Sequence, residues 1–224
     1  GIGFTDANVK VGNTALDSLT TGGANTGVGH NALTANTEGD NNTGIGREAL
    51  TSNTTGDENV AAGAFSLDAN TTGNYNNSFG TQALGSNTTG SNNTAVGHYA
   101  LNTNSTASNN VAIGYHALRL NTTGAFNVAV GYQALDANTT ASSNSAFGSG
   151  ALGANTTGTD NVAVGRYALG GNTTANYNTA IGYAAMQANT TGEYNVAVGS
   201  QALDANTTAD SNVAVGHYSL TKNT

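Results

Sequence analysis

The sequence contains no cysteine, no proline and no tryptophan, and only 8% of its 224 residues are charged. The absence of cysteine excludes a disulfide scaffold, a thiol nucleophile and a cysteine-based metal site. The absence of proline excludes a collagen-like or polyproline rod. Basic residues are scarce, five Lys and Arg against 13 Asp and Glu, and the net charge of −8 argues against nucleic-acid binding. No apolar run approaches the roughly 18 residues of a membrane-spanning helix, so no membrane insertion is expected.

The most abundant residues are Ala (36), Thr (35), Asn (34) and Gly (31), and they are arranged in a repeat of 17 residues. We take residues 155–171 as the reference unit and call each set of positions spaced 17 apart a column, named by its reference residue. The Asn161 column holds Asn, and the Gly165 column holds Gly, in all 13 copies. The Leu169 column holds Leu in 12 of 13 copies, with Met186 as the exception. Such invariance within one chain indicates that every copy has the same structural role.

The repeat unit predicts an all-β fold. In residues 161–165, the β-branched Val162 and Val164 alternate with smaller or polar residues, which predicts a short strand. Residues 167–169 are expected to form a second strand. Residues 155–158 read as a turn in which Gly158 supplies a positive φ. The Gly, Asn and Thr content argues against helices, and the lack of any Asn-Gly pair argues against serial hairpins. We therefore expect a single domain over residues 1–224, a parallel β-solenoid of about 13 coils stacked at ~4.8 Å.

In such a stack, identical residues form ladders along the axis. The structural ladders are expected at Asn121, Asn127, Gly131, Leu135, Asn155, Asn161, Gly165 and Leu169. The two Asn columns are interpreted as amide ladders that close the turns. The alternative is glycosylation, because ten members of the Asn155 column, from Asn53 to Asn206, form N-x-Thr acceptors. The ladder is favoured, since the Asn161 column is equally invariant without being a consistent acceptor, and glycans on every coil would crowd one another.

A coil of 17 residues encloses little apolar volume, so self-association is expected to bury a second face. The large apolar side chains of the Val164 column and the small ones of the Ala163 column lie on opposite faces of the strand. Both cannot line one narrow interior, and the sequence leaves open which of them faces another chain. Both chain ends interrupt a repeat without a capping element. This pattern is expected of a window of a longer fibre or of a filament subunit with open ends.

The strand segments resemble a known motif. Asn127-Val-Ala-Val-Gly131 and Asn110-Val-Ala-Ile-Gly114 resemble the Ser-Val-Ala-Ile-Gly pentads in the heads of trimeric (YadA-like) autotransporter adhesins. The whole unit, Asn-Thr-Thr-Gly-x-x-Asn-Val-Ala-Val-Gly-x-x-Ala-Leu, resembles arrays in phage tail-fibre shafts. The resemblance covers residues 8–224 and implies a left-handed β-roll, a homotrimer and an adhesive or receptor-binding fibre. The unit departs from the adhesin pattern in its longer Asn-Thr-Thr-Gly connection.

Variation between copies is concentrated in the Arg166 and Tyr167 columns, which together hold six of the nine Tyr and all four His. Aromatic and hydrogen-bonding side chains on one ridge are suited to gripping a glycan or a cell-surface receptor. The alternatives are a corner that tolerates any residue and Tyr packing across a subunit interface. The candidate ligand ridge comprises His98, Tyr99, Tyr115, His116, Tyr132, Arg166, Tyr167, Tyr183, His217 and Tyr218.

Catalysis needs unlike groups that converge in a pocket, whereas a repeat makes columns of like groups. We therefore expect no catalytic residues, no cofactor, no metal and no enzymatic activity. The His residues are interpreted as solvated. Asp40, Asp57 and Glu58 suggest a Ca²⁺ site, but a solvated acidic surface is the favoured interpretation.

These observations favour a structural or adhesive fibre protein, extracellular, on a cell surface or on a virion, whose partners are its own copies and a cell-surface glycan or receptor. The alternative is a filament subunit that polymerises end to end through uncapped coils. A third and weaker hypothesis is an ice-binding solenoid, because the Thr157 column would form one outward rank of hydroxyls.

Overall fold

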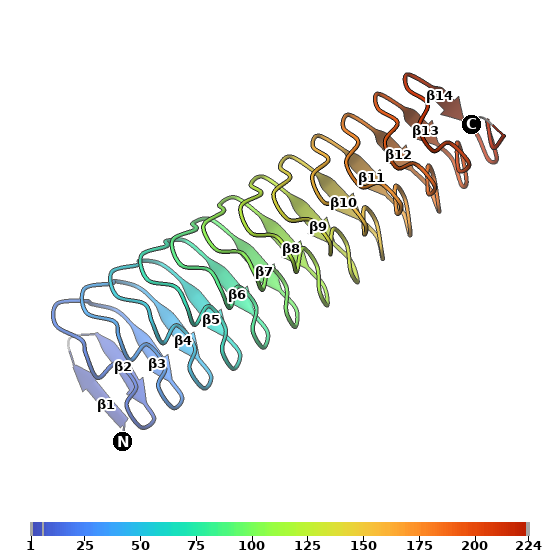
Figure 1. Ribbon diagram of the computed structural model, residues 1–224. Coiled ribbons are helices and arrows are strands. Elements are labelled where there is room, and N and C mark those ends of the chain that lie inside the picture. The colour runs from blue at the N-terminus through green and yellow to red at the C-terminus, as the bar shows by residue number, and fades with distance from the viewer. Residues whose placement is uncertain (1, 6, 223–224) are drawn as a thin grey trace. The chain divides into compact units, whose positions relative to one another are not determined.

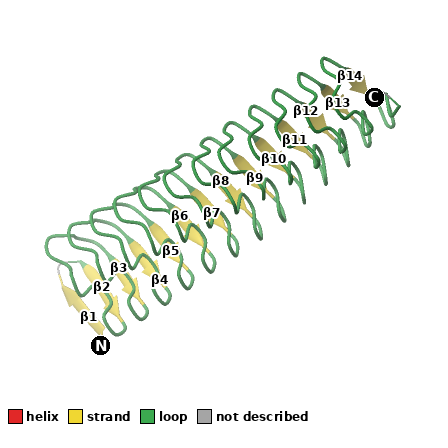
Figure 2. Ribbon diagram, in the orientation of Figure 1, coloured by secondary structure: helices red, strands yellow, loops and turns green. Residues whose placement is uncertain are grey.

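The computed structural model describes residues 2–5 and 7–222, so the expected Asn column member Asn223 lies outside the described residues. The described residues form strands and turns and no helix (Figure 2). They belong to two compact units, Gly1–Asn110 and Val111–Thr224, and the same coil is repeated in both.

Each coil contributes one short strand, and loops and turns complete it (Figure 1). In the first unit the strands are β1 (Ile2–Thr5), β2 (Asn8–Val11), β3 (Thr26–Val28), β4 (Thr43–Ile45), β5 (Val60–Ala62), β6 (Asn77–Phe79) and β7 (Thr94–Val96). In the second unit they are β8 (Val111–Ile113), β9 (Val128–Val130), β10 (Ser145–Phe147), β11 (Val162–Val164), β12 (Thr179–Ile181), β13 (Val196–Val198) and β14 (Val213–Val215).

Within each unit, neighbouring strands from β2 onward are parallel, and each strand residue lies opposite the residue one repeat, or 17 positions, further along the chain. In the pair β11–β12, for example, Val162 lies opposite Thr179 and Val164 opposite Ile181, both 17 residues further on. The ladder continues beyond the strands, because the amide of Gly165 donates to the carbonyl of Phe147 at 2.7 Å. This in-register stacking confirms the predicted parallel β-solenoid with a 17-residue repeat.

The interior of the coil is lined by the small face of the strand. Ala163 has no exposed surface, whereas Val164 is 37% exposed on the opposite face. Ala168 and Leu169 complete the apolar interior, and both are fully buried. The large Val, Ile and Phe side chains of the strands therefore point outward. The structure thus decides the question of faces that the sequence left open.

The expected second strand at residues 167–169 is wrong, because this segment is a pair of consecutive turns. The amide of Ala168 donates to Gly165 O at 3.2 Å, and the amide of Asn172 donates to Leu169 O at 3.1 Å. Tyr167 and Leu169 have φ values of 58° and 49°, which are incompatible with a strand. The same turns are held between coils, since the amide of Leu169 donates to Ala185 O at 3.0 Å.

Gly165 and Gly158 have different physical requirements. Gly165 has a φ of 127° and lies against the next coil, so that an added Cβ would be 2.5 Å from Gly182 O. Gly158, contrary to expectation, is not among the glycines with a positive φ. Its position requires only a small residue, because Gly or Ala fills this column in every coil from residue 22 to residue 209.

The two Asn columns lie inside the coil as hydrogen-bonded ladders. The Asn155 side chain is fully buried, and its Nδ2 donates to Asn138 Oδ1 at 3.1 Å and to Gly158 O at 2.9 Å. The Asn161 Oδ1 accepts the backbone amide of Asn178 at 3.0 Å. Buried amides are thereby satisfied between coils as well as within them. The Asn residues of the ten N-x-Thr acceptors in the Asn155 column lie in this interior, where their Nδ2 atoms face protein rather than solvent.

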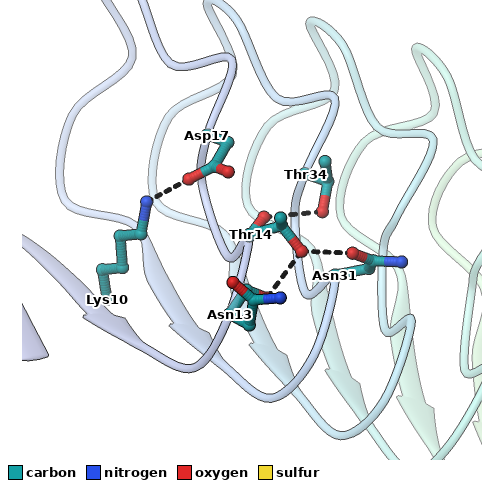
Figure 3. A network of polar contacts seen from close by, with 6 residues as sticks. All are labelled: Lys10, Asn13, Thr14, Asp17, Asn31 and Thr34. Atoms are coloured by element: carbon teal, nitrogen blue, oxygen red, sulfur yellow. Dashed lines mark hydrogen bonds and ion pairs between the residues drawn. The ribbon is translucent and has the colours of Figure 1, made fainter. Parts of the chain in front are cut away.

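The first coil differs from the others (Figure 3). Lys10 occupies the inward column that holds small residues elsewhere, and its Nζ pairs with the carboxylate of Asp17. Beside it, Thr34 Oγ1 donates to Thr14 O at 2.8 Å. β1 runs antiparallel to β2, with Phe4 opposite Val9, and takes up the β2 edge on which a further parallel coil would stack.

Candidate functional site

The Arg166 and Tyr167 columns form the tips of the turns that follow the strands. Arg166 and Tyr167 are the two central residues of the turn closed by the Ala168 amide and Gly165 O. Residues at the tip of such a turn project from the coil, so their side chains are not dictated by the interior. This position explains why the sequence varies here while the rest of the unit is nearly fixed.

The ten candidate residues lie at these turn tips, His98 and Tyr99 in the first unit and the other eight in the second. Eight of them are exposed, and Tyr99 and His116 are half-buried. Neighbouring members within a coil make ring contacts, such as Tyr115 stacked on His116 with centroids 3.9 Å apart. Tyr115 and Tyr132 stack between adjacent coils at 5.5 Å and an interplanar angle of 10°. These turn tips therefore present aromatic side chains that contact one another within and between coils. Ring contacts and cation–π contacts also join the pairs His98–Tyr99, His217–Tyr218 and Arg166–Tyr167.

Charge is held on the ridge by Arg166. Its guanidinium lies 4.7 Å from the centroid of the Tyr167 ring, and its Nη2 is 3.4 Å from the Tyr167 hydroxyl. The hydrogen bond to this hydroxyl raises the pKa of Arg166 above its ordinary value. The side chain is fully exposed and remains cationic over the whole physiological pH range.

A second exposed aromatic column was missed by the sequence reasoning. Tyr75, Phe126, Tyr177 and Tyr194 occupy the Asp160 column and are 50–63% exposed. Tyr177 and Tyr194, on adjacent coils, stack with centroids 5.0 Å apart. The signal was available, because the three Tyr residues outside the ridge are all spaced by multiples of 17. Their column has a positive φ in the structure, 59° at Tyr177, which directs these side chains away from the coil.

The acidic column contains hydrogen-bonded turn residues. Asp40 Oδ1 accepts the backbone amide of Gly23 at 2.6 Å, and Asp57 Oδ1 accepts that of Asp40 at 2.8 Å. In the same way, Asn74 Oδ1 accepts a hydrogen bond from the backbone amide of Asp57 at 2.7 Å. These carboxylates therefore connect successive coils, a role that an amide fills equally well. Among the described residues, no three His, Cys, Asp or Glu side chains are grouped so that they could hold a metal ion.

The two Thr columns have different environments. Thr156 is half-buried, and its Oγ1 donates to Thr173 O of the next coil at 3.0 Å. Thr157 is exposed, and the Thr residues of its column are exposed from Thr55 to Thr208. One outward rank of hydroxyls results, in the place where the sequence predicted it.

No helix in the described part of the chain is long and apolar enough to cross a membrane. Comparison of the chain with protein-family models, with curated proteins and with solved structures gave no match.

Proposed function

We propose that the chain is a non-enzymatic, extracellular fibre segment that associates laterally with its own copies and presents its turn ridge to cell-surface glycans or receptors. The observation that carries this proposal is the orientation of the strands. Large apolar residues face solvent, as in Phe147 at 42% and Ile181 at 40% exposure, while Ala fills the interior. An apolar face of this kind usually marks an interaction site.

The outward strand face suits a second copy of the same chain. From Val9 to Val215, neither the Val162 nor the Val164 column contains a charged residue, although the chain has a net charge of −8. Two copies can therefore meet on this face without opposing like charges. The apolar side chains recur once per coil on both copies, so that a contact made by one coil is repeated by the next. A threefold bundle is the arrangement that the resemblance to adhesin heads implies.

The assembly is tested by measuring its mass with sedimentation equilibrium. We expect the wild-type chain to have the mass of three chains. Phe147→Asp places a charge on the outward face of β10 and is expected to shift the mass towards one chain. Thr140→Asp, on the exposed Thr column, is the matched control and is expected to leave the mass unchanged. A wild-type chain that remains a folded monomer at every concentration would refute the lateral association.

The adhesive part of the proposal is tested separately on a glycan array. Removing the stacked pair Tyr115 and Tyr132 by alanine substitution is expected to reduce binding by about tenfold. The control removes the stacked pair Tyr177 and Tyr194 from the other aromatic column. Equal losses in both variants, or no binding by the wild type, would count against the ridge as the ligand surface.

The alternative function is an end-to-end filament. It requires coils of one copy to stack on coils of another through open strand edges. β1 already occupies the edge of β2, and Lys10 and Asp17 place an ion pair at the end of the interior. Stacking at this end would have to displace that strand, so lateral association is the better supported mode.

A further inference from the structure

The turn ridge is interrupted at one position. In the Tyr167 column, Gly150 lies between Gln133 on the preceding coil and Tyr167 on the next. The backbone does not require glycine here, since φ is 67° at Gly150, 52° at Gln133 and 58° at Tyr167. What distinguishes Gly150 is therefore its missing side chain, which leaves a gap in the ridge.

Two further glycines widen this gap. In the Gly170 column, Asp136 is followed by Gly153 and then Gly170 on the next two coils. The result is a surface hollow with a volume of about 300 Å³. It is lined by residues of three successive coils: Gln133 and Asp136 on the first, Gly150, Gly153 and Ala154 on the second, and Tyr167 and Gly170 on the third.

A fixed carboxylate lines one side of the hollow. Arg119 holds Asp136 through two contacts, Nε to Oδ1 at 2.9 Å and Nη2 to Oδ2 at 3.3 Å. Such bidentate pairing fixes the orientation of the carboxylate and offsets its charge. Donating to Asp136 also raises the pKa of Arg119, so the guanidinium stays cationic. Each Asp136 oxygen retains capacity to accept a second hydrogen bond from a ligand hydroxyl.

An aromatic ring lines the other side. The Tyr167 ring leans over Gly150, where an added Cβ would be 2.7 Å from the ring atoms Cδ1 and Cε1. Arg166 holds the ring from its own coil through the cation–π contact at 4.7 Å. The absence of a side chain at position 150 therefore makes room for the Tyr167 ring and also opens the hollow.

We propose that this hollow binds one neutral pyranose unit of a glycan. The inference rests on the proposed adhesive function and assigns the ridge a specific ligand site. The C–H face of a pyranose packs on an aromatic ring, and its hydroxyls donate to a carboxylate and pair with an amide such as that of Gln133. A volume of about 300 Å³ accommodates a single sugar ring. The Arg119–Asp136 pair carries no net charge, so it attracts neither an acidic sugar or phosphate nor a free cation.

The test uses a variant that the chain itself has already accepted elsewhere. Gly150→Gln fills the hollow. Gln is already followed by Tyr on the next coil at two other places in this column, Gln82–Tyr99 and Gln201–Tyr218. The matched control is Gly85→Gln, because Gln187 occupies the same column as Gly85. Binding is measured on the full chain by saturation-transfer NMR with galactose, glucose, mannose and N-acetylglucosamine, up to roughly 50 mM, since single-sugar contacts have Kd values of about 1 mM or weaker.

We expect at least one of these sugars to bind the wild type and the Gly85→Gln variant, with transfer from the Tyr167 ring protons. Gly150→Gln is expected to weaken binding by about tenfold or more. Binding that survives Gly150→Gln, or the absence of binding by all four sugars, would overturn the assignment of the hollow. If the wild type nevertheless binds the glycan array, the adhesive function stands and only this site is wrong. If neither the sugars nor the array are bound, the adhesive function fails as well.

Discussion

The side-chain amide of Asn155 donates to Asn138 Oδ1, 17 residues earlier, at 3.1 Å from a position with no exposed surface. The same side chain accepts a hydrogen bond of 2.8 Å from Asn172 Nδ2 on the next coil. Each of these buried amides therefore depends on an Asn neighbour on either side for part of its hydrogen bonding. A ladder of this kind couples the coils, so that the loss of one member affects three of them.

Asn155→Ala is expected to lower the free energy of unfolding by about 2–4 kcal/mol, because the buried Asn138 Oδ1 loses its donor and Asn172 Nδ2 loses one of its two acceptors. Urea unfolding followed by circular dichroism measures the change. Thr157→Ala, on the exposed neighbouring column, is the control and is expected to change stability by less than about 0.5 kcal/mol. Equal effects of the two substitutions would contradict a structural role for the ladder.

Gly165→Ala is expected to destabilise the chain by about 3 kcal/mol or more, because φ is 127° and the new Cβ would lie 2.5 Å from Gly182 O. Gly216 provides the matched control. Its φ is 123°, but an added Cβ would meet only Ser219 Cβ, at 3.9 Å. Gly216→Ala therefore introduces the backbone strain without the clash between coils. If thermal unfolding shows the same loss for both variants, crowding between coils is not the reason for glycine in this column.

Because Ala163 points into the coil and Val164 points out of it, substitutions at these adjacent residues are expected to affect stability differently. Ala163→Leu forces a large side chain into an interior that holds Ala146 and Ala180 on the neighbouring coils, and is expected to cost about 3 kcal/mol. Val164→Thr changes an outward side chain and is expected to shift the stability of the unassociated chain by less than about 0.5 kcal/mol. Urea unfolding in dilute solution separates the two. A larger effect of Val164→Thr would mean that the large apolar face lines the interior.

The stacking of the coils could be predicted from the sequence because identical residues 17 apart must occupy equivalent positions, as Asn155 and Asn172 do. The direction of the strand faces could not, since alternation separates Ala163 from Val164 without saying which of them is inside. That choice depends on the narrow cross-section of the coil, in which buried Asn and Leu side chains already fill most of the space.

The second strand was predicted wrongly for a different reason. Tyr favours extended backbone, and neither Tyr nor Leu commonly adopts a positive φ. Their φ values of 58° and 49° are imposed by the packing of Leu169 inside the coil and by hydrogen bonds between coils. Local preference is overridden here by contacts with neighbouring repeats. The hollow at Gly150 was equally hidden, because its shape depends on where the Tyr167 ring lies rather than on any motif.

Asp68 gives the chain a specific dependence on pH. Burial raises the pKa of this carboxyl, the repulsion from Glu48 adds to the shift, and the hydrogen bond to its own backbone opposes it. A carboxyl whose pKa is higher in the folded state than in the unfolded chain binds its proton more tightly when folded. Its contribution therefore favours the folded state at acid pH and is lost as pH rises through the folded pKa.

Asp68→Asn keeps the backbone hydrogen bond and removes the buried charge. We expect the variant to have a Tm a few degrees above that of the wild type at neutral pH, with the difference shrinking as pH falls below the folded pKa of Asp68. Thermal unfolding across the acid-to-neutral range measures this difference. Asp204→Asn, in the same column, controls for the general benefit of removing one carboxylate from a chain of net charge −8. A Tm difference for Asp68→Asn that grows towards acid pH would show that the carboxylate is stabilising when charged, and that burial is not its dominant influence.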